Sequence, residues 1–151
     1  MPVRRNRKTI LVVDDSPEML RYYRTLLEFD AYTVETAASG VDALQALRKG
    51  LDPDAVILDW QMPRLNGLGT LKRLRRLRPK LKVIICSGSM NSGMQEQASL
   101  FHVEACLAKP VDHLYLSAAL DRCFQPTPRA KPAPRQTVIL AFPEPQGPAG
   151  A

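Results

Sequence analysis

Short apolar runs that alternate with helical segments constrain the fold of this chain more than any other feature. Four of these runs are nearly continuous, which is typical of strands buried on both faces of a parallel sheet. A fifth, residues 32–37, alternates between apolar and polar side chains and is therefore expected at a sheet edge. The four nearly continuous runs are residues 9–13, 55–58, 81–86 and 104–108.

A helical pattern follows each of the five strands. Ser16 is expected to cap the first helix, which has Pro17 in its first turn and extends to about Phe29. The second helix begins at Ser39-Gly40 and stops near Gly50. Strands that alternate with helices five times predict an α/β fold, a doubly wound parallel sheet covered by helices on both faces. The remaining helices are expected over residues 68–78, about 92–101 and about 112–124.

The composition changes after residue 124, and this change defines two regions. Residues 8–124 are expected to form one domain. Residues 125–151 contain seven of the thirteen prolines and are expected to be largely extended or disordered, because they bury too little apolar surface to offset their ordering entropy. A short apolar island, 137–142, is expected to be covered by pairing with a sheet edge or by a partner. The tail as a whole is interpreted either as a linker to a further domain or as a docking arm.

The formal charge of +6 raises the question of a nucleic-acid partner. The basic cluster from Lys72 to Lys82 coincides with leucines at every third position, so a solvated helix face explains it better, and direct nucleic-acid binding is not expected. No apolar run approaches the ~20 residues of a membrane span, and no signal peptide precedes Asp14. We therefore predict a cytoplasmic protein. The three cysteines lack disulfide or zinc spacing and are interpreted as small buried residues.

Reactive side chains stand where the apolar runs end. The first run ends in Asp14 and Asp15, the third in Asp59, the fourth in Ser87 and the fifth in Lys109. Ligand sites of open α/β sheets lie beyond the carboxyl ends of the strands. Right-handed crossovers leave few topologies, and in the strand order 2-1-3-4-5 the first and third strands are neighbours. In that order the three carboxylates converge, with the serine and the lysine beside them.

The chemistry of this set favours phosphoryl transfer to the protein itself. Three close carboxylates repel one another unless a cation binds them, and Mg²⁺ prefers such oxygen ligands. Mg²⁺, a lysine and a hydroxyl together neutralise a transferring phosphoryl group. The chain lacks a Gly-x-x-x-x-Gly-Lys-Ser/Thr loop, so nucleotide binding is not indicated. An aspartate is therefore the expected acceptor. Taken singly, each residue has an ordinary explanation in a helix start, a turn or the surface, but their shared position argues against coincidence.

From about residue 8 to residue 124 the chain resembles the receiver domain of bacterial two-component response regulators. The matching motifs are Ile-Leu-Val-Val-Asp-Asp at residues 10–15, Asp59-x-x-Met62-Pro63-x-x-x-Gly67, Ser87, and Lys109-Pro110. The resemblance implies a flavodoxin-like fold with five parallel strands in the order 2-1-3-4-5. It also implies phosphorelay signalling by a protein that is not an enzyme and promotes only its own phosphorylation and dephosphorylation.

The resemblance further implies a metal site. Asp15 is expected to bind Mg²⁺ directly and Asp14 to act through water. Asp59 and the backbone carbonyl of Gln61 are expected to complete the set of ligands.

Roles in phosphoryl transfer follow from the same resemblance. Asp59 is expected to accept the phosphoryl group from a sensor histidine kinase or phosphotransfer protein. Ser87 is expected to hydrogen-bond the phosphoryl oxygens in the active state, and Lys109 to pair with them. The Lys109–Pro110 bond is expected to be cis.

Two departures from the family pattern bear on output. Receiver domains usually carry Tyr or Phe three residues before the lysine, but this chain has Cys106, which puts the usual transmission to the fourth and fifth helices in doubt. The Gly-Ala pair common before the fifth strand reads His102-Val103, so that loop is expected to differ.

We predict a single-domain response regulator that signals to an unknown downstream protein. One alternative is a receiver-like interaction module with a weakened switch, and another is a receiver fragment of a larger regulator. A phosphatase of the haloacid-dehalogenase type is disfavoured, because that family needs Asp-x-Asp after the first strand.

Overall fold

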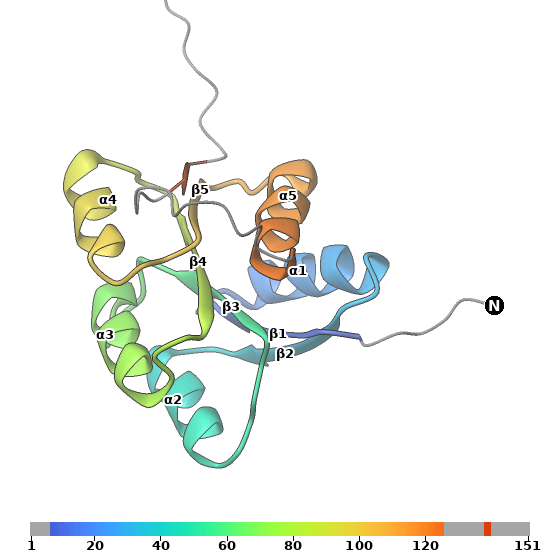
Figure 1. Cartoon of the computed structure of the whole chain (residues 1–151), viewed down its shortest axis with the longest axis horizontal. Helices are drawn as coiled ribbons and strands as arrows, with labels where there is room; N and C mark the ends of the chain where they lie inside the picture. The colour runs from blue at the N-terminus through green and yellow to red at the C-terminus, as the bar shows by residue number, and fades with distance from the viewer. Residues whose placement is uncertain (1–6, 126–137, 140–151) are drawn as a thin grey trace, which may run out of the picture.

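The computed structural model describes residues 7–125 and 138–139, and its strands and helices alternate along the chain (Figure 1). Within this part of the chain, no helix is both long enough and apolar enough to cross a membrane. The elements are β1 (Thr9–Val13), α1 (Pro17–Phe29), β2 (Thr33–Ala37), α2 (Gly40–Arg48), β3 (Ala55–Asp59), α3 (Gly67–Leu77), β4 (Lys82–Ser87), α4 (Ser92–Ser99), β5 (Ala105–Ala108), α5 (His113–Phe124) and β6 (Val138–Ile139).

All strand pairs of the sheet are parallel, and the strand order is β2-β1-β3-β4-β5-β6. The predicted order 2-1-3-4-5 is therefore confirmed for the first five strands. As predicted, β2 lies at an edge. Its burial does not alternate strictly, because Val34 and Ala37 are buried and the other three residues are exposed. Because β1 and β3 are neighbours, the carboxyl ends that carry the predicted acidic residues lie side by side.

The tail adds a sixth strand that the five-stranded prediction did not include. Val138 pairs with Ala105 and Ile139 with Cys106, so these two residues of the apolar island cover part of the β5 edge. The rest of the island and of the tail, residues 126–137 and 140–151, lie outside the described residues. The extended or disordered character expected for the tail remains a prediction.

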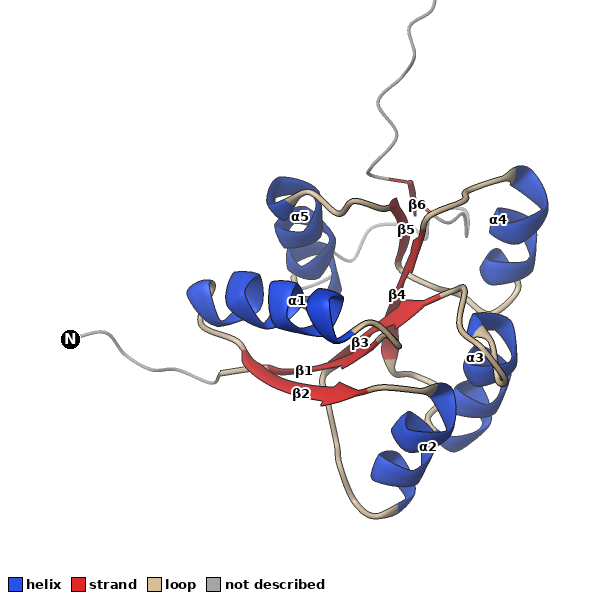
Figure 2. Ribbon diagram, turned by 180° about the vertical axis from the view of Figure 1, so that it is seen from behind, coloured by secondary structure: helices blue, strands red, loops and turns tan. Residues whose placement is uncertain are grey.

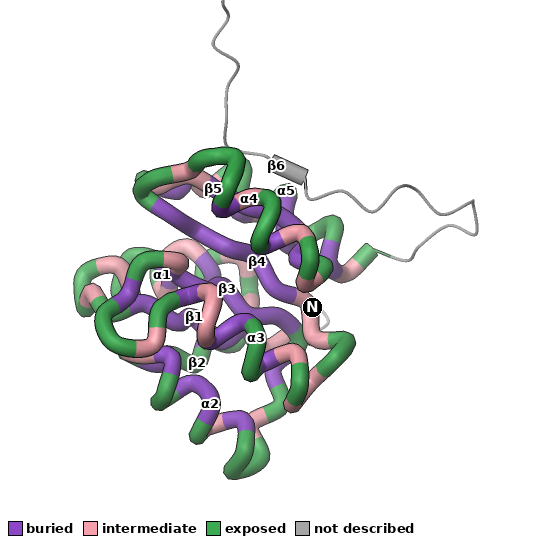
Figure 3. The backbone as a smooth tube through the Cα atoms, turned by 90° about the vertical axis from the view of Figure 1, so that its left-hand side faces the viewer, coloured by how far each residue is buried: buried purple, intermediate pink, exposed green. Residues whose placement is uncertain are grey.

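The sheet is covered on both faces, which gives the molecule three layers (Figure 2). One face packs against α1 and α5, and the other packs against α2, α3 and α4. Successive strand residues point to opposite faces, so Ile10 and Val12 face the first pair of helices, and Leu11 and Val13 face the other three. Figure 3 shows the buried strands in the middle of the molecule.

Side-chain caps determine where the helices begin. The hydroxyl of Ser16 accepts a hydrogen bond from the amide of Met19 at 3.2 Å, as the sequence predicted for α1. In the same way Asn66 accepts from the amide of Gly69 at 2.9 Å at the start of α3. The caps begin α1 and α3 within a few residues of the ends of β1 and β3. The residues that follow these strands therefore lie in short loops at the carboxyl edge of the sheet.

The basic cluster around α3 is only partly a solvated face. Lys72, Arg73 and Arg76 are exposed, as expected. The expectation is wrong for Arg75, whose guanidinium donates to the carbonyls of Phe101, Leu81 and His102, and for Arg78, which donates to those of Leu47 and Leu51. A sequence pattern shows which residues are cationic, but the carbonyls that they bind lie far away along the chain.

The three cysteines are free and buried, as the sequence predicted. Burial raises the pKa of each thiol to about 12, because a buried thiolate has lost its hydration. They therefore serve as apolar packing residues on both faces of the sheet.

Candidate functional site

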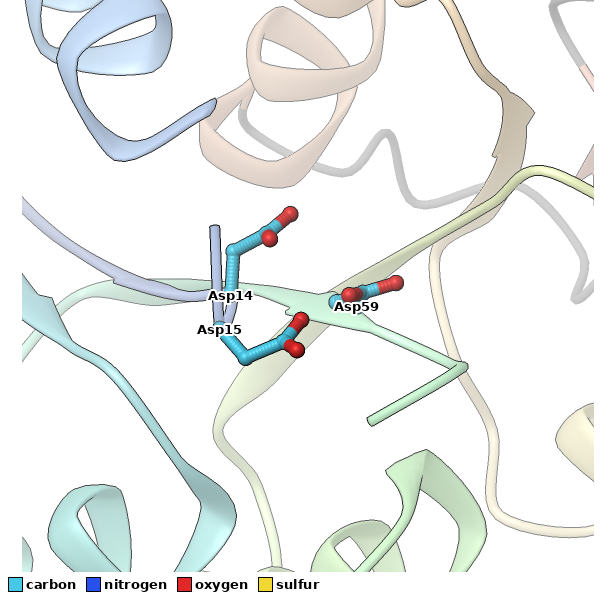
Figure 4. Close-up of side chains that lie close together, drawn as sticks. All are labelled: Asp14, Asp15 and Asp59. Atoms are coloured by element: carbon cyan, nitrogen blue, oxygen red, sulfur yellow. The ribbon is translucent and has the colours of Figure 1, made fainter. Parts of the chain in front are cut away.

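Three carboxylates meet where β1 and β3 end. Asp14 and Asp15 follow β1, and Asp59 is the last residue of β3. One carboxylate oxygen from each lies within 4.8 Å of the others, and Figure 4 shows the three side chains together. Asp14 and Asp59 are 1% and 3% exposed, whereas Asp15 is exposed. The cluster is therefore buried on one side and open to solvent on the other.

Lys109, which follows β5, contacts two of these carboxylates. Its Nζ lies 3.0 Å from Oδ2 of Asp14 and 3.2 Å from Oδ1 of Asp59. Its backbone amide donates to the carbonyl of Ser87 at 2.8 Å, and this bond ties the end of β5 to the end of β4. The Lys109–Pro110 bond is cis, as predicted. One ammonium group thus offsets part of the repulsion between two buried carboxylates.

Backbone amides orient the two buried carboxylates. The amide of Ser16 donates to Oδ1 of Asp14 at 2.9 Å, and the amide of Gln61 donates to Oδ1 of Asp59 at 3.2 Å. Gly67 keeps the loop after Asp59 tight, since a Cβ at this position would lie 2.5 Å from the Cα of Trp60 and 2.8 Å from the Asp59 carbonyl oxygen. The glycine of the predicted motif therefore has a steric role in holding the acidic residue in place.

The charges in the site shift the pKa of both Asp59 and Lys109. Burial raises the pKa of the Asp59 carboxyl, the charge of Asp14 raises it further, and Lys109 opposes both effects without cancelling them. Burial alone would lower the pKa of Lys109, but its hydrogen bond to Asp14 and the charge of Asp59 outweigh burial and raise it. Lys109 is therefore positively charged at neutral pH, and it lies beside Asp59, whose ionised form is disfavoured by burial and by the charge of Asp14.

Ser87 lies at the predicted strand end but does not contact the carboxylates. Its side chain is fully buried, its hydroxyl donates to the carbonyl of Ser89 at 3.2 Å, and it accepts from the Ser89 amide at 3.1 Å. The predicted hydrogen bond to phosphoryl oxygens concerns a different state of the protein and remains a prediction.

Sequence reasoning missed two residues that lie beneath the site, Tyr23 and Cys86. Tyr23 of α1 is 1% exposed, and its hydroxyl has no hydrogen-bond partner among the described residues. Burial, the neighbouring Cys86, and the charges of Asp14 and Asp59 all raise the pKa of Tyr23. The helical spacing indicates that Tyr23 faces the core. Its position near Cys86 and the carboxylates depends on how α1 packs on the sheet, and no sequence signal reveals that packing.

The residues present fit a hard divalent cation. Carboxylate oxygens are the ligands that Mg²⁺ prefers, and Mg²⁺ usually keeps several waters. The exposed Asp15 leaves room for those waters, and the buried pair supplies the negative charge. The amide of Gln61 bonds to Asp59, so the backbone of Gln61 lies beside the cluster, whereas its carbonyl as a ligand remains a prediction.

The fold and the cluster define a flavodoxin-like α/β domain with an acidic site at the carboxyl edge of its parallel sheet. Comparison with known families makes this more specific. The response regulator receiver domain matches residues 10–121, and the chain belongs to this family. Receiver domains act in two-component signalling, and phosphorylation and magnesium binding are typical of them.

The curated relatives are longer proteins that contain such a domain. Response regulator MprA of Mycobacterium sp. (strain KMS) is 42% identical over 85 residues, which cover 56% of this chain and 34% of that protein. The protein-glutamate methylesterase/protein-glutamine glutaminase of Agrobacterium fabrum is 36% identical over 105 residues, which cover 67% of this chain and 29% of that protein. The chain thus spans about a third of the length of the curated relatives that it matches.

Solved structures confirm the fold. A receiver domain protein from Clostridium thermocellum is 32% identical with a TM-score of 0.72, and the match covers 77% of this chain and 93% of that one. Chemotaxis protein CheY4 of Vibrio cholerae is 25% identical with a TM-score of 0.74, and the match covers 79% and 100%. The bounds of the domain, residues 8–124, and the role of the tail remain predictions.

Proposed function

We propose that this chain is a single-domain response regulator that accepts a phosphoryl group on Asp59 and signals by binding another protein. The observation that carries the proposal is Lys109, whose ammonium group lies 3.2 Å from Asp59 and 3.0 Å from Asp14. A cation fixed between two buried carboxylates stabilises the further negative charge that a phosphoryl group brings. Membership of the receiver family supports the same role.

The donor is a phosphohistidine on a sensor histidine kinase or a phosphotransfer protein. A carboxylate oxygen of Asp59 attacks phosphorus, a P–O bond forms and the P–N bond breaks. The imidazole nitrogen keeps the electron pair of the broken bond and takes a proton. Lys109 pairs with the charge that develops on the phosphoryl oxygens, and Ser87 donates its hydroxyl to one of them.

Mg²⁺, held by Asp14, Asp15, Asp59 and the backbone carbonyl of Gln61, supplies charge neutralisation at the phosphoryl oxygens when it is bound. The buried carboxylate of Asp14 also orients Lys109 through their 3.0 Å contact. The protein acts in the cytoplasm, and its partners are the phosphoryl donor and one downstream protein. Direct binding to nucleic acid or membrane is not part of the proposal.

Trp60 offers a direct test, because it is the only tryptophan of the chain and follows Asp59. Acetyl phosphate or beryllium fluoride with Mg²⁺ should change the Trp60 fluorescence of the wild type and leave that of Asp59→Asn unchanged. Asp52→Asn is the matched control, since Asp52 is exposed and precedes the opposite end of β3. The proposal is wrong if the wild type and Asp59→Asn respond alike.

A second variant tests the role of Lys109 in the reaction. Lys109→Met keeps much of the side-chain length and removes the charge, so the rate of phosphorylation by acetyl phosphate should fall roughly 100-fold. Lys72→Met, at an exposed position of α3, should react at the wild-type rate. Equal rates for the two variants would show that the contacts of Lys109 with Asp14 and Asp59 do not assist transfer.

Cys106 favours a second candidate function, an interaction module with a weakened switch. It is fully buried in the core cluster shared with α3 and α4. A small side chain that is already inside cannot move inward as an aromatic residue does at this position in related domains. The two functions differ in one measurable way: capture of partners with and without beryllium fluoride should differ for a switch and agree for a constitutive module.

A receiver fragment of a larger regulator and a phosphatase have less support. The matched segments cover only about a third of the curated relatives, so the length of the natural protein tests whether this chain is such a fragment. The haloacid-dehalogenase phosphatases are a different family from the receiver domains that this chain matches. Turnover of p-nitrophenyl phosphate would nevertheless revive the phosphatase.

A further inference from the structure

The outer edge of β5, which would otherwise be the edge of the five-stranded sheet, is paired with β6 in this structure. β6 lies beyond β5 and runs parallel to it, with Val138 opposite Ala105 and Ile139 opposite Cys106. The edge of a sheet exposes unpaired amides and carbonyls, so an extended segment can bind there through its backbone alone. The β5 edge is therefore a strand-binding surface, and the ligand that it accepts is a short apolar segment with β-branched residues.

The connection from β5 to β6 within one chain has an unfavourable handedness. The crossovers from β2 to β3, β3 to β4 and β4 to β5 place α2, α3 and α4 on one face of the sheet and are right-handed. The step from β5 to β6 continues in the same direction across the sheet, but α5 lies on the opposite face. A crossover that stays on the α5 face while the sheet continues in this direction is left-handed, whereas about 98% of parallel crossovers are right-handed.

The connecting segment is also much longer than the step within one chain requires. α5 ends at Phe124, and residues 126–137 separate the described end of the domain from β6. Loops from a helix to the next strand usually need about 2–6 residues. The segment has twelve residues and four prolines, which favour extended backbone and allow a reach of up to about 40 Å.

We propose that the β5 edge binds residues 138–139 of a second copy of this chain, so that two copies exchange their tails and form a symmetric dimer. In the exchanged form each strand keeps its parallel register on β5, but it arrives from another molecule, and no left-handed crossover is needed. The long proline-containing segment then spans the gap between two domains. Two copies of one surface that bind each other's strands close the assembly at two members.

The exchange predicts a weak, concentration-dependent dimer, because the pairing of each strand within the described residues spans two residues. Size-exclusion chromatography with light scattering on the full chain, up to about 1 mM, measures it. The double variant Val138→Pro/Ile139→Pro removes both strand amides, so it should raise the dimer dissociation constant at least about tenfold. Gln146→Pro/Gly147→Pro places the same two prolines later in the tail and should dimerise like the wild type.

A wild type that stays monomeric up to about 1 mM would overturn the proposal. So would a dimer that the strand variant leaves intact, since it must use another surface. If the proline variant does not give the wild-type urea midpoint, Val138→Lys/Ile139→Lys replaces it, because charges oppose pairing at an edge without restricting the backbone. Mixing copies that carry donor and acceptor dyes should give energy transfer in the wild type and not in either strand variant.

The exchange and the proposed phosphoacceptor function can fail separately. All of the dimer measurements are made without a phosphoryl donor, so loss of the Asp59 reaction does not alter them. A monomeric protein would likewise leave the fluorescence response of Trp60 to beryllium fluoride unaffected.

Discussion

At the scale of single residues, Asp59 is the clearest case of a functional side chain that costs stability. Its carboxyl is 3% exposed, and its pKa is raised above the ordinary value of 3.8. A carboxyl with a raised pKa in the folded state contributes stability only below its ordinary pKa, and this contribution is lost as the pH rises through the raised value. At neutral pH the ionised Asp59 therefore destabilises the fold.

Asp59→Asn removes this charge and should stabilise the protein at pH 7 by on the order of 1 kcal/mol. The gain should shrink as the pH falls toward and below the raised pKa, because the wild-type carboxyl is then protonated. Urea denaturation in EDTA between pH 7 and pH 4.5 measures both effects. Adding Mg²⁺ should stabilise the wild type more than the variant, since the ion binds only the folded site. A variant less stable than the wild type at pH 7 would contradict the reasoning.

Removing the hydroxyl of either of two adjacent tyrosines of α1 should change the stability of the protein in opposite directions. The buried hydroxyl of Tyr23 has no partner among the described residues, so Tyr23→Phe should stabilise the protein by up to about 1 kcal/mol. The hydroxyl of Tyr22 donates to the carbonyl of Val111 at 2.6 Å, so Tyr22→Phe should cost about 1 kcal/mol. Urea midpoints of the two variants decide the matter, and a Tyr23→Phe variant that loses stability would reveal a partner for its hydroxyl.

One departure from the family pattern has a local explanation. His102 stands where related domains commonly carry glycine, and it adopts a left-handed φ of 58°. A non-glycine residue in this region costs roughly 1–2 kcal/mol. The loop before β5 thus places a non-glycine residue in a turn that suits glycine, and the expected difference in its path from related domains remains a prediction.

At the scale of elements, Arg75 joins α3 to the segments that precede β4 and β5. Its Nε donates to the Phe101 carbonyl at 2.8 Å and its Nη1 to the Leu81 carbonyl at 2.6 Å. Burial lowers the pKa of Arg75, which reflects how far the guanidinium has left water. The same helix carries exposed arginines, so burial of this one depends on its position in the turn.

Arg75→Ala should cost roughly 2–3 kcal/mol, because it leaves several carbonyls without donors. Arg76→Ala, one residue further and exposed, should stay within about 0.5 kcal/mol of the wild type. Chemical denaturation of both variants measures the difference. Similar costs would mean that the contacts of Arg75 with Phe101 and Leu81 add nothing beyond helix propensity and surface charge.

At the scale of the whole molecule, the packing of both sheet faces should protect the three cysteines together. Each thiol is buried and has a pKa of about 12, so only roughly one in ten thousand is ionised at pH 8. Native protein should react with a thiol reagent at least about 100-fold more slowly than protein in denaturant, where all three should react. One fast thiol in the native protein would show that one face opens locally.

Much of the fold could be predicted from the sequence. Apolar runs with abrupt polar ends located the strands, and Ser16 with Pro17 located a helix start. The predicted elements agree with the structure to within a few residues, and Asp59 and Ser87 proved to be the last residues of their strands. These features were predictable because period and capping are properties of neighbouring residues.

The sequence by itself determined which residues have reactive side chains and which strand each of them ends. The alternation of strands and helices then required these ends to share one edge of a parallel sheet. Only the tertiary structure decided that Lys109 reaches Asp14 and Asp59, that Arg75 is half-buried while Arg76 is exposed, and that β6 lies on β5. The reason is physical: each of these contacts joins positions far apart in the chain, and their distances depend on how helices pack on the sheet.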